Sequence, residues 1–533
     1  MTISKLKINW ILLFLSGGLS LFFIVLFYGS LNDFWLDNLF NTDSLYLPSL
    51  YQDFFIDSGK VGSWVFNSSP NFVPDMLLYF PLNYLTGNFR LTTIVFSLVQ
   101  QVILLMLLYN LFRRFFGKNE ISYHILVFLL TVIFILPFFT ANDYYLSFLF
   151  VSNTFHFGTF IMALASLNLA FWFMEKKSYP VLILLIIIQI IAFLSDRLFL
   201  VLFTGPAFLT FALTYKNRQS LVLAISQVGV ALVGFILFNN LKGFFNIHLS
   251  LPHRISEISY FFDSLQMMMQ QFVVYFSNAN LVALILILTF VSFVFAAIIV
   301  IRNYRSVIFS AQPDKILIYL LFSVFFIPAV IMAPLLNGSY TNFDTIRYIV
   351  FAFYLAIFNI PVILWFFREK INTQIVQLSG IILFVGLLGF GIFLTTKTNL
   401  GQQISKMTNY YPALVERVDK VVVEEGLKFG LANYWDAKHI TMFSKSGVKI
   451  YAVKDNLKAH YHVSNQDWFY GCSDCTIGEK EFNFILLNRF VDREAVNYFL
   501  NEEHKMIKND NLEILITKPF VMSRKTNRPA MFK

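Results

Sequence analysis

Long apolar runs recur at short intervals along this chain, and they constrain its fold more than any other feature. Between residues 9 and 395, successive runs of about 17 to 25 residues are almost free of charge. Such a run crosses a hydrocarbon core about 30 Å thick as an α-helix, because a helix satisfies its own backbone hydrogen bonds. Of all residues, 57% are hydrophobic and 13% are charged. The sequence therefore predicts a polytopic α-helical membrane protein.

The apolar runs predict about eleven transmembrane helices. They lie at residues 9–29, 91–112, 122–139, 155–174, 180–195, 198–215, 220–239, 280–301, 315–334, 348–367 and 375–395. The segment 74–87, PDMLLYFPLNYLTG, is too short and too broken by proline to span, so we expect an interfacial or re-entrant helix there. No small-residue cleavage site follows the first run, which predicts a retained span rather than a removed signal peptide.

Charge in the short loops predicts the orientation, because lysine and arginine are retained on the cytoplasmic side. Basic clusters occupy alternate loops, at residues 5–7, 113–118, 175–177, 215–218, 301–305 and 367–370. The remaining loops carry the acidic residues. We therefore expect a cytoplasmic N-terminus and an external C-terminal domain. The net charge of +9 is explained largely by this pattern, so nucleic-acid binding is not expected.

The chain divides into a membrane module at 1–395, with an acidic first external loop at 30–90, and an external (periplasmic) domain at 396–533. In that domain, strand-like runs at 427–434, 448–454, 482–490 and 511–518 alternate with helix-like runs that end at Gly447 and span 492–504. This alternation predicts a small α/β domain, parallel in part. No glycine-rich phosphate loop appears at its turns, so the alternation alone does not indicate a nucleotide site.

Both cysteines of the chain, Cys472 and Cys475, lie in the external domain within YGCSDCTIG. A CxxC pair is found in redox motifs and in half of a zinc site, but a second pair of metal ligands is missing here. A local disulfide in an oxidising compartment is the simplest expectation.

Several acids stand near the outer ends of the predicted spans. The stretch NTDSLYLPSLYQDFF, residues 41–55, predicts an amphipathic segment with its leucines and tyrosines toward lipid or core and with Asp43 facing a cleft. In the next external loop, TANDYYLSF contains Asp143. An acid costs about 2.5–3.5 kcal/mol at the bilayer centre but little at a helix end. Each acid can therefore equally be a solvated loop residue.

Two further external turns combine charges. FLSDRLF contains Asp196 and Arg197, and NFDTIRYIVF contains Arg347 and Tyr348. A carboxylate can deprotonate a hydroxyl and an arginine can hold two phosphate oxygens, which together suit glycosyl transfer from a lipid phosphate. The alternatives are a turn-stabilising pair for Asp196 with Arg197, and an interfacial snorkelling arginine for Arg347. His156, on an apolar run, is expected to be a core histidine.

The layout resembles the glycosyltransferase C superfamily, which includes protein O-mannosyltransferases, oligosaccharyltransferases and the aminoarabinose transferase of lipid A. Shorter segments are similar to a bacterial multi-spanning group described as candidate glycosyltransferases. These segments are TDSLYLPSLYQD, SSPNFVPDMLLYFPL, LSDRLFL, NFDTIRYIV and GLANYWDAKHITMFSKSGVKIYAV. The chain has Asp-Ser at 43–44 instead of the Asp-Glu pair of the protein O-mannosyltransferases, and it lacks a WWD-type signature, which argues against protein mannosylation and N-linked transfer.

The resemblance implies an enzyme of the bacterial inner membrane that uses a polyprenyl-phosphate-linked sugar donor and a glycan, glycolipid or protein acceptor at the lipid bilayer. By position, Asp43 matches the general base. Asp143 matches an acid that binds the donor phosphate or a divalent cation (Mg or Mn), and Arg347 matches an arginine that contacts the lipid phosphate. Asp196, Arg197 and Tyr348 are further candidates for that phosphate or metal.

The remaining candidates are Asp53 and Asp75, as a second acid or acceptor contact, and Tyr434, Trp435 and Asp436, as sugar contacts that can equally be packing residues. Two other functions stay open. A transporter or flippase for a lipid-linked sugar predicts ionisable residues deep within the spans. A non-catalytic envelope assembly protein predicts that Asp43 is dispensable.

Overall fold

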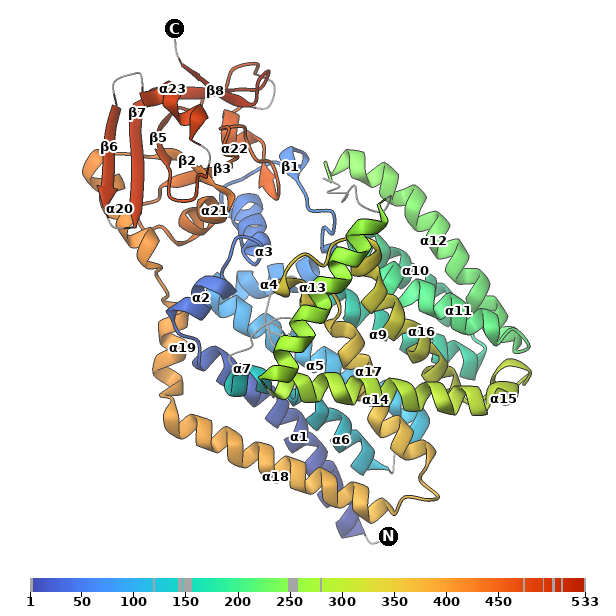
Figure 1. The fold of residues 1–533 in the computed structure, drawn as a ribbon. Helices are drawn as coiled ribbons and strands as arrows, with labels where there is room; N and C mark the ends of the chain where they lie inside the picture. Colours follow the sequence, from blue (N-terminus) through green and yellow to red (C-terminus); the bar gives the residue numbers. More distant parts are fainter. Residues whose placement is uncertain are drawn as a thin grey trace.

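A computed structural model of the chain describes residues 3–117, 120–141, 146, 156–247, 257–278, 280–472, 475–491, 493–500, 504–509 and 511–531. Figure 1 shows two parts, a large body of helices and a smaller α/β domain. The N-terminus lies at the end of the helical body far from the α/β domain, and the C-terminus lies at the outer edge of that domain (Figure 1).

Seven helices of the described residues are long and apolar enough to cross a membrane, by length and composition. They are α1 (Ile3–Gly29), α5 (Phe89–Phe116), α9 (Phe157–Lys176), α12 (Arg218–Phe244), α14 (Leu281–Arg302), α16 (Lys315–Leu336) and α18 (Thr373–Lys397). This is the build of a multi-pass membrane protein. The other four predicted spans coincide with shorter apolar helices, so eleven crossings stay a prediction. These are α6 (Ile121–Val132), α10 (Tyr179–Ser195), η4–α11 (Leu200–Thr204 and Gly205–Leu213) and α17 (Val350–Phe366).

Asparagine side chains define where several of these helices begin. Asn88 accepts hydrogen bonds from the backbone N–H groups of Arg90 and Leu91 at the start of α5. Asn280 caps α14 and Asn372 caps α18 in the same way. Such caps satisfy backbone donors that the first turn of a helix leaves unpaired.

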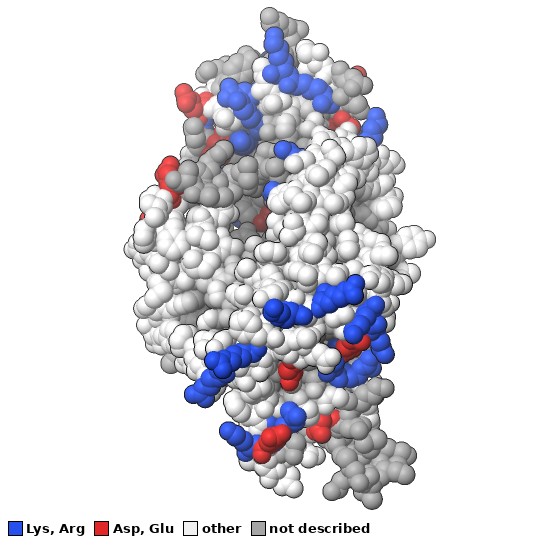
Figure 2. Space-filling view, turned by 90° about the vertical axis from the view of Figure 1, so that its right-hand side faces the viewer, with Lys and Arg blue, Asp and Glu red and all other residues white. Residues whose placement is uncertain are grey.

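The basic ends of the helices converge on one end of the body. Arg114 at the end of α5 and Lys315 at the start of α16 both pair with Glu175 at the end of α9. Figure 2 shows Lys and Arg in a band across the lower half of the molecule, with a mostly white belt between this band and the α/β domain at the top. The basic loops therefore share one side, as predicted, while the compartment on that side stays a prediction.

The loop at residues 30–90, which the sequence predicts to be external and which we call the first external loop, folds into short elements packed between the helical body and the α/β domain. They are α2 (Asp33–Leu39), α3 (Tyr46–Tyr51), η1 (Gln52–Ile56), η2 (Val61–Ser63), β1 (Trp64–Val65), η3 (Phe72–Met76) and α4 (Leu77–Thr86). Leu45, Leu47 and Leu50 are fully buried. The apolar side of the segment 41–55 thus packs into the protein core.

Among the described residues, three more short elements and one long helix complete the helical body: α7 (Leu136–Ala141), α15 (Tyr304–Ile308) and η5 (Phe343–Tyr348), and the long α13 (Ile258–Ser277). The sequence reasoning missed α13. This helix buries polar residues: Gln271 donates to the backbone oxygen of Phe343 at 2.9 Å and accepts from the hydroxyl of Tyr340 at 2.5 Å. Its apolar pattern is too interrupted to be recognised as a span.

The α/β domain contains a mixed sheet with strand order β3-β2-β5-β7-β6, and β8 pairs with β7. Strands β2 and β3 and strands β2 and β5 are parallel, and the other pairs are antiparallel. The strands are β2 (Phe429–Asn433), β3 (Lys449–Val453), β5 (Phe482–Leu486), β6 (His504–Asn509), β7 (Leu512–Ser523) and β8 (Arg528–Met531). Helix α19 (Leu400–Thr408) links the helical body to this domain. The helices of the domain are α20 (Ala413–Glu425), α21 (Tyr434–Phe443), α22 (Asp467–Tyr470), η6 (Glu494–Val496) and α23 (Asn497–Leu500).

The partly parallel sheet agrees with the sequence prediction, but the helix expected over 492–504 is wrong in extent. In this region the described residues form only η6 and α23, and β6 begins at His504. Strand β6 pairs with β7 from His504 to Asn509. At His504, pairing with the strand that follows next in the chain has overridden the local helical pattern.

The first external loop and the α/β domain are joined directly. Strand β1 pairs antiparallel with β4 (Ser464–Asn465) of the domain. Near the start of α20, the hydroxyl of Tyr410 donates to Asp37 at 2.6 Å. Of the candidate residues predicted in the loop, Asp43 and Asp53 contact this domain.

Candidate functional site

Asp43 lies where the first external loop meets the start of α21. The hydroxyl of Tyr434 donates a hydrogen bond to Asp43 Oδ1 at 2.8 Å. The neighbouring Thr42 donates to the backbone oxygens of Tyr434, at 3.1 Å, and Trp435, at 3.0 Å. Asn433 caps α21, so the loop and the helix N-terminus hold each other in place.

Two cations share the neighbourhood of Asp43. Lys438, four residues after Tyr434 and therefore on the same face of α21, is 8% exposed, and its Nζ has no hydrogen-bond partner among the described residues. Burial lowers the pKa of Lys438 to about 7, although the charge of Asp43 acts in the opposite direction. Burial also works against the charge of Arg347, but Tyr348, Asp43 and Asp344 outweigh it and raise the pKa of Arg347.

This arrangement combines the chemical groups that are required for a transfer reaction from a phosphate. A carboxylate within reach of a hydroxyl can accept its proton, and nearby cations can stabilise negative charge that develops on a phosphate. Asp43 and Arg347 were predicted from the sequence, and they come together from segments more than 300 residues apart. Lys438 was not predicted, because nothing in its local sequence distinguishes it from a surface lysine on an amphipathic helix.

A second cluster surrounds Asp196, which is 1% exposed at the end of α10. Its carboxylate accepts hydrogen bonds from Ser69 Oγ at 2.7 Å and Thr159 Oγ1 at 2.6 Å, and it contacts His156 Nδ1 at 2.5 Å. Burial alone would raise the pKa of Asp196, but His156 and the hydrogen bonds lower it. The guanidinium of Arg197 lies over the Phe238 ring, 5.0 Å from its centroid.

His156 was missed as a site residue. It was expected to be a core histidine, yet it begins α9 in the left-handed conformation (φ 66°) and pairs with the Asp196 carboxylate. Its ring lies 5.8 Å from the ring of Tyr348. Tyr348 lies under the guanidinium of Arg347, at 5.2 Å. The Asp196 cluster is thereby connected to the residues around Asp43.

Asp75 is buried beside this second cluster. It is 4% exposed, and Gln100 Nε2 donates to its Oδ1 at 3.2 Å. Burial, helped by the charge of Asp196, raises the pKa of Asp75 to about 8. A neutral carboxyl group at pH 7 can donate a proton, whereas the more acidic Asp196 can only accept hydrogen bonds.

Asp53 belongs to the joint between loop and domain. It is 3% exposed and accepts hydrogen bonds from the indole N–H groups of Trp64, at 2.5 Å, and Trp468, at 2.6 Å, and from Asn465 at 2.8 Å. Three donors around one buried carboxylate indicate a structural role, because they come from both parts that Asp53 connects.

Of the three predicted sugar contacts, only Tyr434 contacts Asp43. Asp436 is 2% exposed and pairs with Arg489 at 2.8 Å, and Trp435 is 46% exposed. Burial raises the pKa of Asp436, although Arg489 opposes this. Asp143 lies outside the described residues.

A cavity of about 810 Å³ lies between the first external loop and the α/β domain. Thr42, Tyr434 and Lys438, which surround Asp43, line one part of it, and Asp53 and Trp468 line another. Asp43 itself is not among the lining residues. The cavity therefore reaches the neighbours of Asp43 from the side of the domain.

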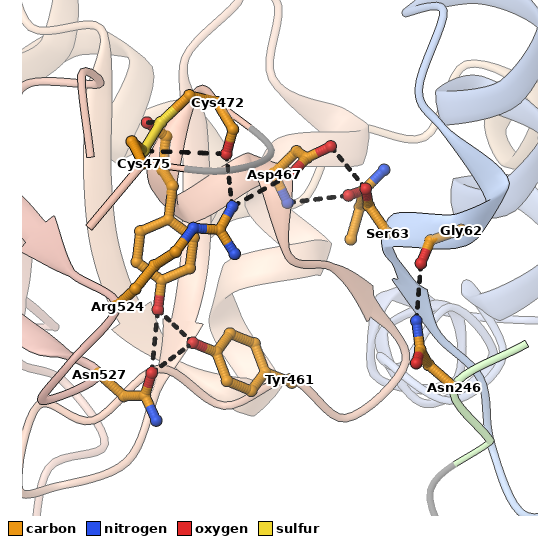
Figure 3. A network of polar contacts seen from close by, with 11 residues as sticks. Gly62, Ser63, Asn246, Tyr461, Asp467, Cys472, Cys475, Arg524 and Asn527 are labelled. Carbon is orange, nitrogen blue, oxygen red and sulfur yellow. Dashed lines mark hydrogen bonds and ion pairs between the residues drawn. A yellow bond between two sulfur atoms is a disulfide. The ribbon is translucent and has the colours of Figure 1, made fainter. Parts of the chain in front are cut away.

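A polar network secures the loop beside this cavity (Figure 3). Asp467 accepts a hydrogen bond from Ser63 at 2.6 Å and pairs with Arg524, which also donates to the backbone oxygen of Cys472. Cys472 and Cys475 are joined by a disulfide. On the other side of the loop, Asn246 donates to the backbone oxygen of Gly62 at 2.6 Å.

The described residues contain no group of three or more His, Cys, Asp and Glu side chains that could hold a metal ion. Because Asp143 is outside these residues, the divalent cation stays a prediction.

No protein-family model matches this chain, and no curated protein matches it either. Its function is therefore inferred from the geometry of the site.

Proposed function

We propose that this protein is an integral-membrane glycosyltransferase, which moves a sugar from a polyprenyl-phosphate donor to an envelope glycolipid, polysaccharide or protein acceptor on the external face. The observation that carries the proposal is the position of the Asp43 carboxylate. It lies at the junction of the helical body and the α/β domain, bonded to Tyr434 and close to the charges of Lys438 and Arg347.

In the proposed reaction, the acceptor hydroxyl attacks the anomeric carbon while Asp43 accepts the hydroxyl proton. The bond between the anomeric carbon and the phosphate oxygen breaks, and its electron pair leaves with the polyprenyl phosphate. A single displacement of this kind inverts the anomeric configuration.

Arg347 is suited to the leaving phosphate, because a guanidinium can hold two phosphate oxygens at once. Its raised pKa keeps it charged. Tyr434 orients Asp43 through a hydrogen bond that the carboxylate accepts. Mg²⁺ or Mn²⁺ would add charge compensation when bound, but no step above depends on one.

The proposal is tested by profiling envelope glycolipids and polysaccharides by mass spectrometry in cells that lack the protein. The deletion is complemented with the wild type, with Asp43→Asn, or with Asp33→Asn, all expressed to equal levels. Asp33 is a matched control because it lies in the same loop, is 68% exposed and pairs with Lys406 on the surface.

We expect the deletion to lose a defined sugar that the wild type and Asp33→Asn restore. Asp43→Asn should restore less than about 1% of it, because removal of a general base typically costs a factor of about 10² to 10⁴. If Asp43→Asn restored the sugar to the wild-type level, Asp43 would not be the general base. That result would favour a lipid-linked sugar transporter or an assembly protein.

A further inference from the structure

The cavity beside Asp43 has features of a ligand site that the proposed reaction does not yet use. Its walls come from the first external loop and from the α/β domain. Its volume of about 810 Å³ lies in the range of pockets that hold a small organic molecule. Arg347 is not among the lining residues, so the candidate donor-phosphate contact lies outside the cavity.

Lys438 is the strongest indication of what the cavity binds. Its side chain lines the cavity, is 8% exposed and leaves Nζ without a hydrogen-bond partner among the described residues. A buried ammonium group without partners is costly to keep. A bound anion would provide the missing hydrogen-bond acceptor and opposite charge.

The charges of the lining leave an excess of cations. Five lysines and three aspartates line the cavity. They are Lys60, Lys428, Lys438, Lys449 and Lys480, and Asp53, Asp57 and Asp467. All three aspartates are already engaged: Asp53 by two indoles and Asn465, Asp57 by Lys449 at 3.0 Å, and Asp467 by Ser63 and Arg524 (Figure 3). The lining therefore favours a negatively charged ligand.

Aromatic rings form part of the wall that the α/β domain contributes. Tyr451 and Trp468 line the cavity and stack on each other, with ring centroids 5.6 Å apart and planes 19° apart. Lys480 places its Nζ 4.8 Å above the Tyr451 ring. Burial lowers the pKa of Lys480 to about 8. An aromatic wall with an ammonium group at its edge suits a ring-shaped ligand that has one apolar face and an anionic substituent.

We propose that this cavity binds an acidic sugar unit of the acceptor, a sugar ring that carries a phosphate or a carboxylate. The inference rests on the proposed function in one respect, namely that the bound sugar belongs to the acceptor. Lys438 binds the anionic group, and the aromatic wall holds the ring. The hydroxyl to be glycosylated then lies on the side of the cavity formed by Thr42 and Tyr434, next to Asp43.

The test uses the purified full-length protein in lipid nanodiscs and saturation-transfer NMR, which detects weak sugar binding. The probes are glucose 6-phosphate, glucuronate and uncharged glucose. Two variants are compared with the wild type: Lys438→Met, and Lys458→Met as a matched control, since Lys458 is exposed and does not line the cavity.

For the wild type, we expect saturation transfer to glucose 6-phosphate, to glucuronate or to both, and binding of uncharged glucose that is weaker by at least about tenfold. Lys438→Met should bind the same charged sugar at least about tenfold more weakly than the wild type does. Lys458→Met should bind like the wild type. Transfer to glucose 6-phosphate alone would identify a phosphosugar, and to glucuronate alone a uronic acid. Equal binding of charged and uncharged sugars, or an unchanged Lys438→Met, would overturn the proposal. If Lys438→Met does not fold, Lys480→Met is subject to the same criterion.

Failure of this inference is separable from failure of the proposed function. Asp43→Asn should still bind the acidic sugar while it fails to restore the glycan in cells. If the acidic sugar binds but Asp43 is dispensable in cells, the cavity is still a sugar-binding site, whereas the proposed glycosyltransferase function is wrong. If Asp43 is required but no acidic sugar binds, the transferase remains and the cavity proposal is wrong.

Discussion

At the scale of single residues, burial changes the chemistry of acids that look alike in the sequence. Asp33 and Asp75 both belong to the first external loop, but Asp33 is exposed whereas Asp75 is 4% exposed. Burial and the charge of Asp196 raise the pKa of Asp75 to about 8. Depth of burial, which local sequence does not reveal, therefore decides the protonation of Asp75 at neutral pH.

This shift predicts a pH-dependent stability difference between the wild type and Asp75→Asn. Because the folded pKa is raised from 3.8 to about 8, the native state binds the extra proton and loses stability as the pH rises from about 4 to about 8. An asparagine at position 75 keeps a side-chain oxygen that can accept the hydrogen bond from Gln100, and it does not ionise. Asp75→Asn should therefore match the wild type near pH 4 and exceed its unfolding free energy by at least about 1 kcal/mol at pH 8.

Apparent melting temperatures of the two proteins in detergent, measured from pH 4 to pH 8, check this expectation. A constant difference across that range would show that Asp75 does not titrate as proposed. Asp33→Asn serves as the control and should follow the wild type at every pH.

At the scale of elements, the start of α9 is built to let Asp75 approach. Gly158 is the second residue of that helix, and a Cβ atom there would collide with both carboxylate oxygens of Asp75. Glycine in a helix is normally unfavourable compared with alanine. Its presence here is explained by the close approach of the buried carboxyl group.

Gly158→Ala should therefore destabilise the protein by about 1–3 kcal/mol, as overpacking does. Gly229→Ala in α12 is the matched control, because no heavy atom of the described residues beyond its chain neighbours and its own helix backbone lies within 4 Å of the added Cβ. This change should be neutral or stabilising by up to about 1 kcal/mol. Chemical or thermal unfolding in detergent measures both.

A double variant locates the cause. Gly158→Ala combined with Asp75→Ala should lose less stability than the sum of the two single changes, because the collision partner is gone. Strict additivity would mean that the destabilisation arises elsewhere in α9.

Other elements show where sequence patterns were sufficient. The apolar runs predicted the helical body, and strand-like runs predicted β2, β3, β5 and β7. The helix expected over 492–504 is only partly present, as η6 and α23, and at His504 the chain instead pairs with β7. The amphipathic segment around Asp43 was predicted, but only packing decided that Leu45, Leu47 and Leu50 meet the core instead of lipid.

At the scale of the whole molecule, the basic helix ends and the candidate site residues lie at opposite ends of the helical body. Basic helix ends meet at one end of the body, while Asp43, Asp75, Asp196 and Arg347 lie near the end that carries the α/β domain. Lys and Arg retained in short loops mark the cytoplasmic side. The α/β domain is accordingly expected outside the inner membrane.

Reporter fusions test this orientation. Alkaline phosphatase fused after residue 533 should be active and a green fluorescent protein at the same place dark, since the first needs export and the second does not fluoresce after unfolded export. Fusions after residue 216, in a basic loop, should behave in the opposite way. The reverse result at residue 533 would place the α/β domain in the cytoplasm and remove the proposed external reaction.

The sequence by itself determined the class of protein, the division into a membrane module and an α/β domain, and the shared side of the basic loops. These properties depend on local composition, because hydrocarbon crossing and charge retention act on one segment at a time. It also selected Asp43, Asp196 and Arg347 as candidates.

Only the tertiary structure decided how those candidates are combined. Tyr434 is bonded to Asp43 across 391 positions of the chain, and His156 is the partner of Asp196 although it looked like a core residue. The isolation of Lys438 and the cavity that it lines exist only where the loop and the domain meet. Burial and contacts between distant segments are properties of the packed chain, so no local pattern encodes them.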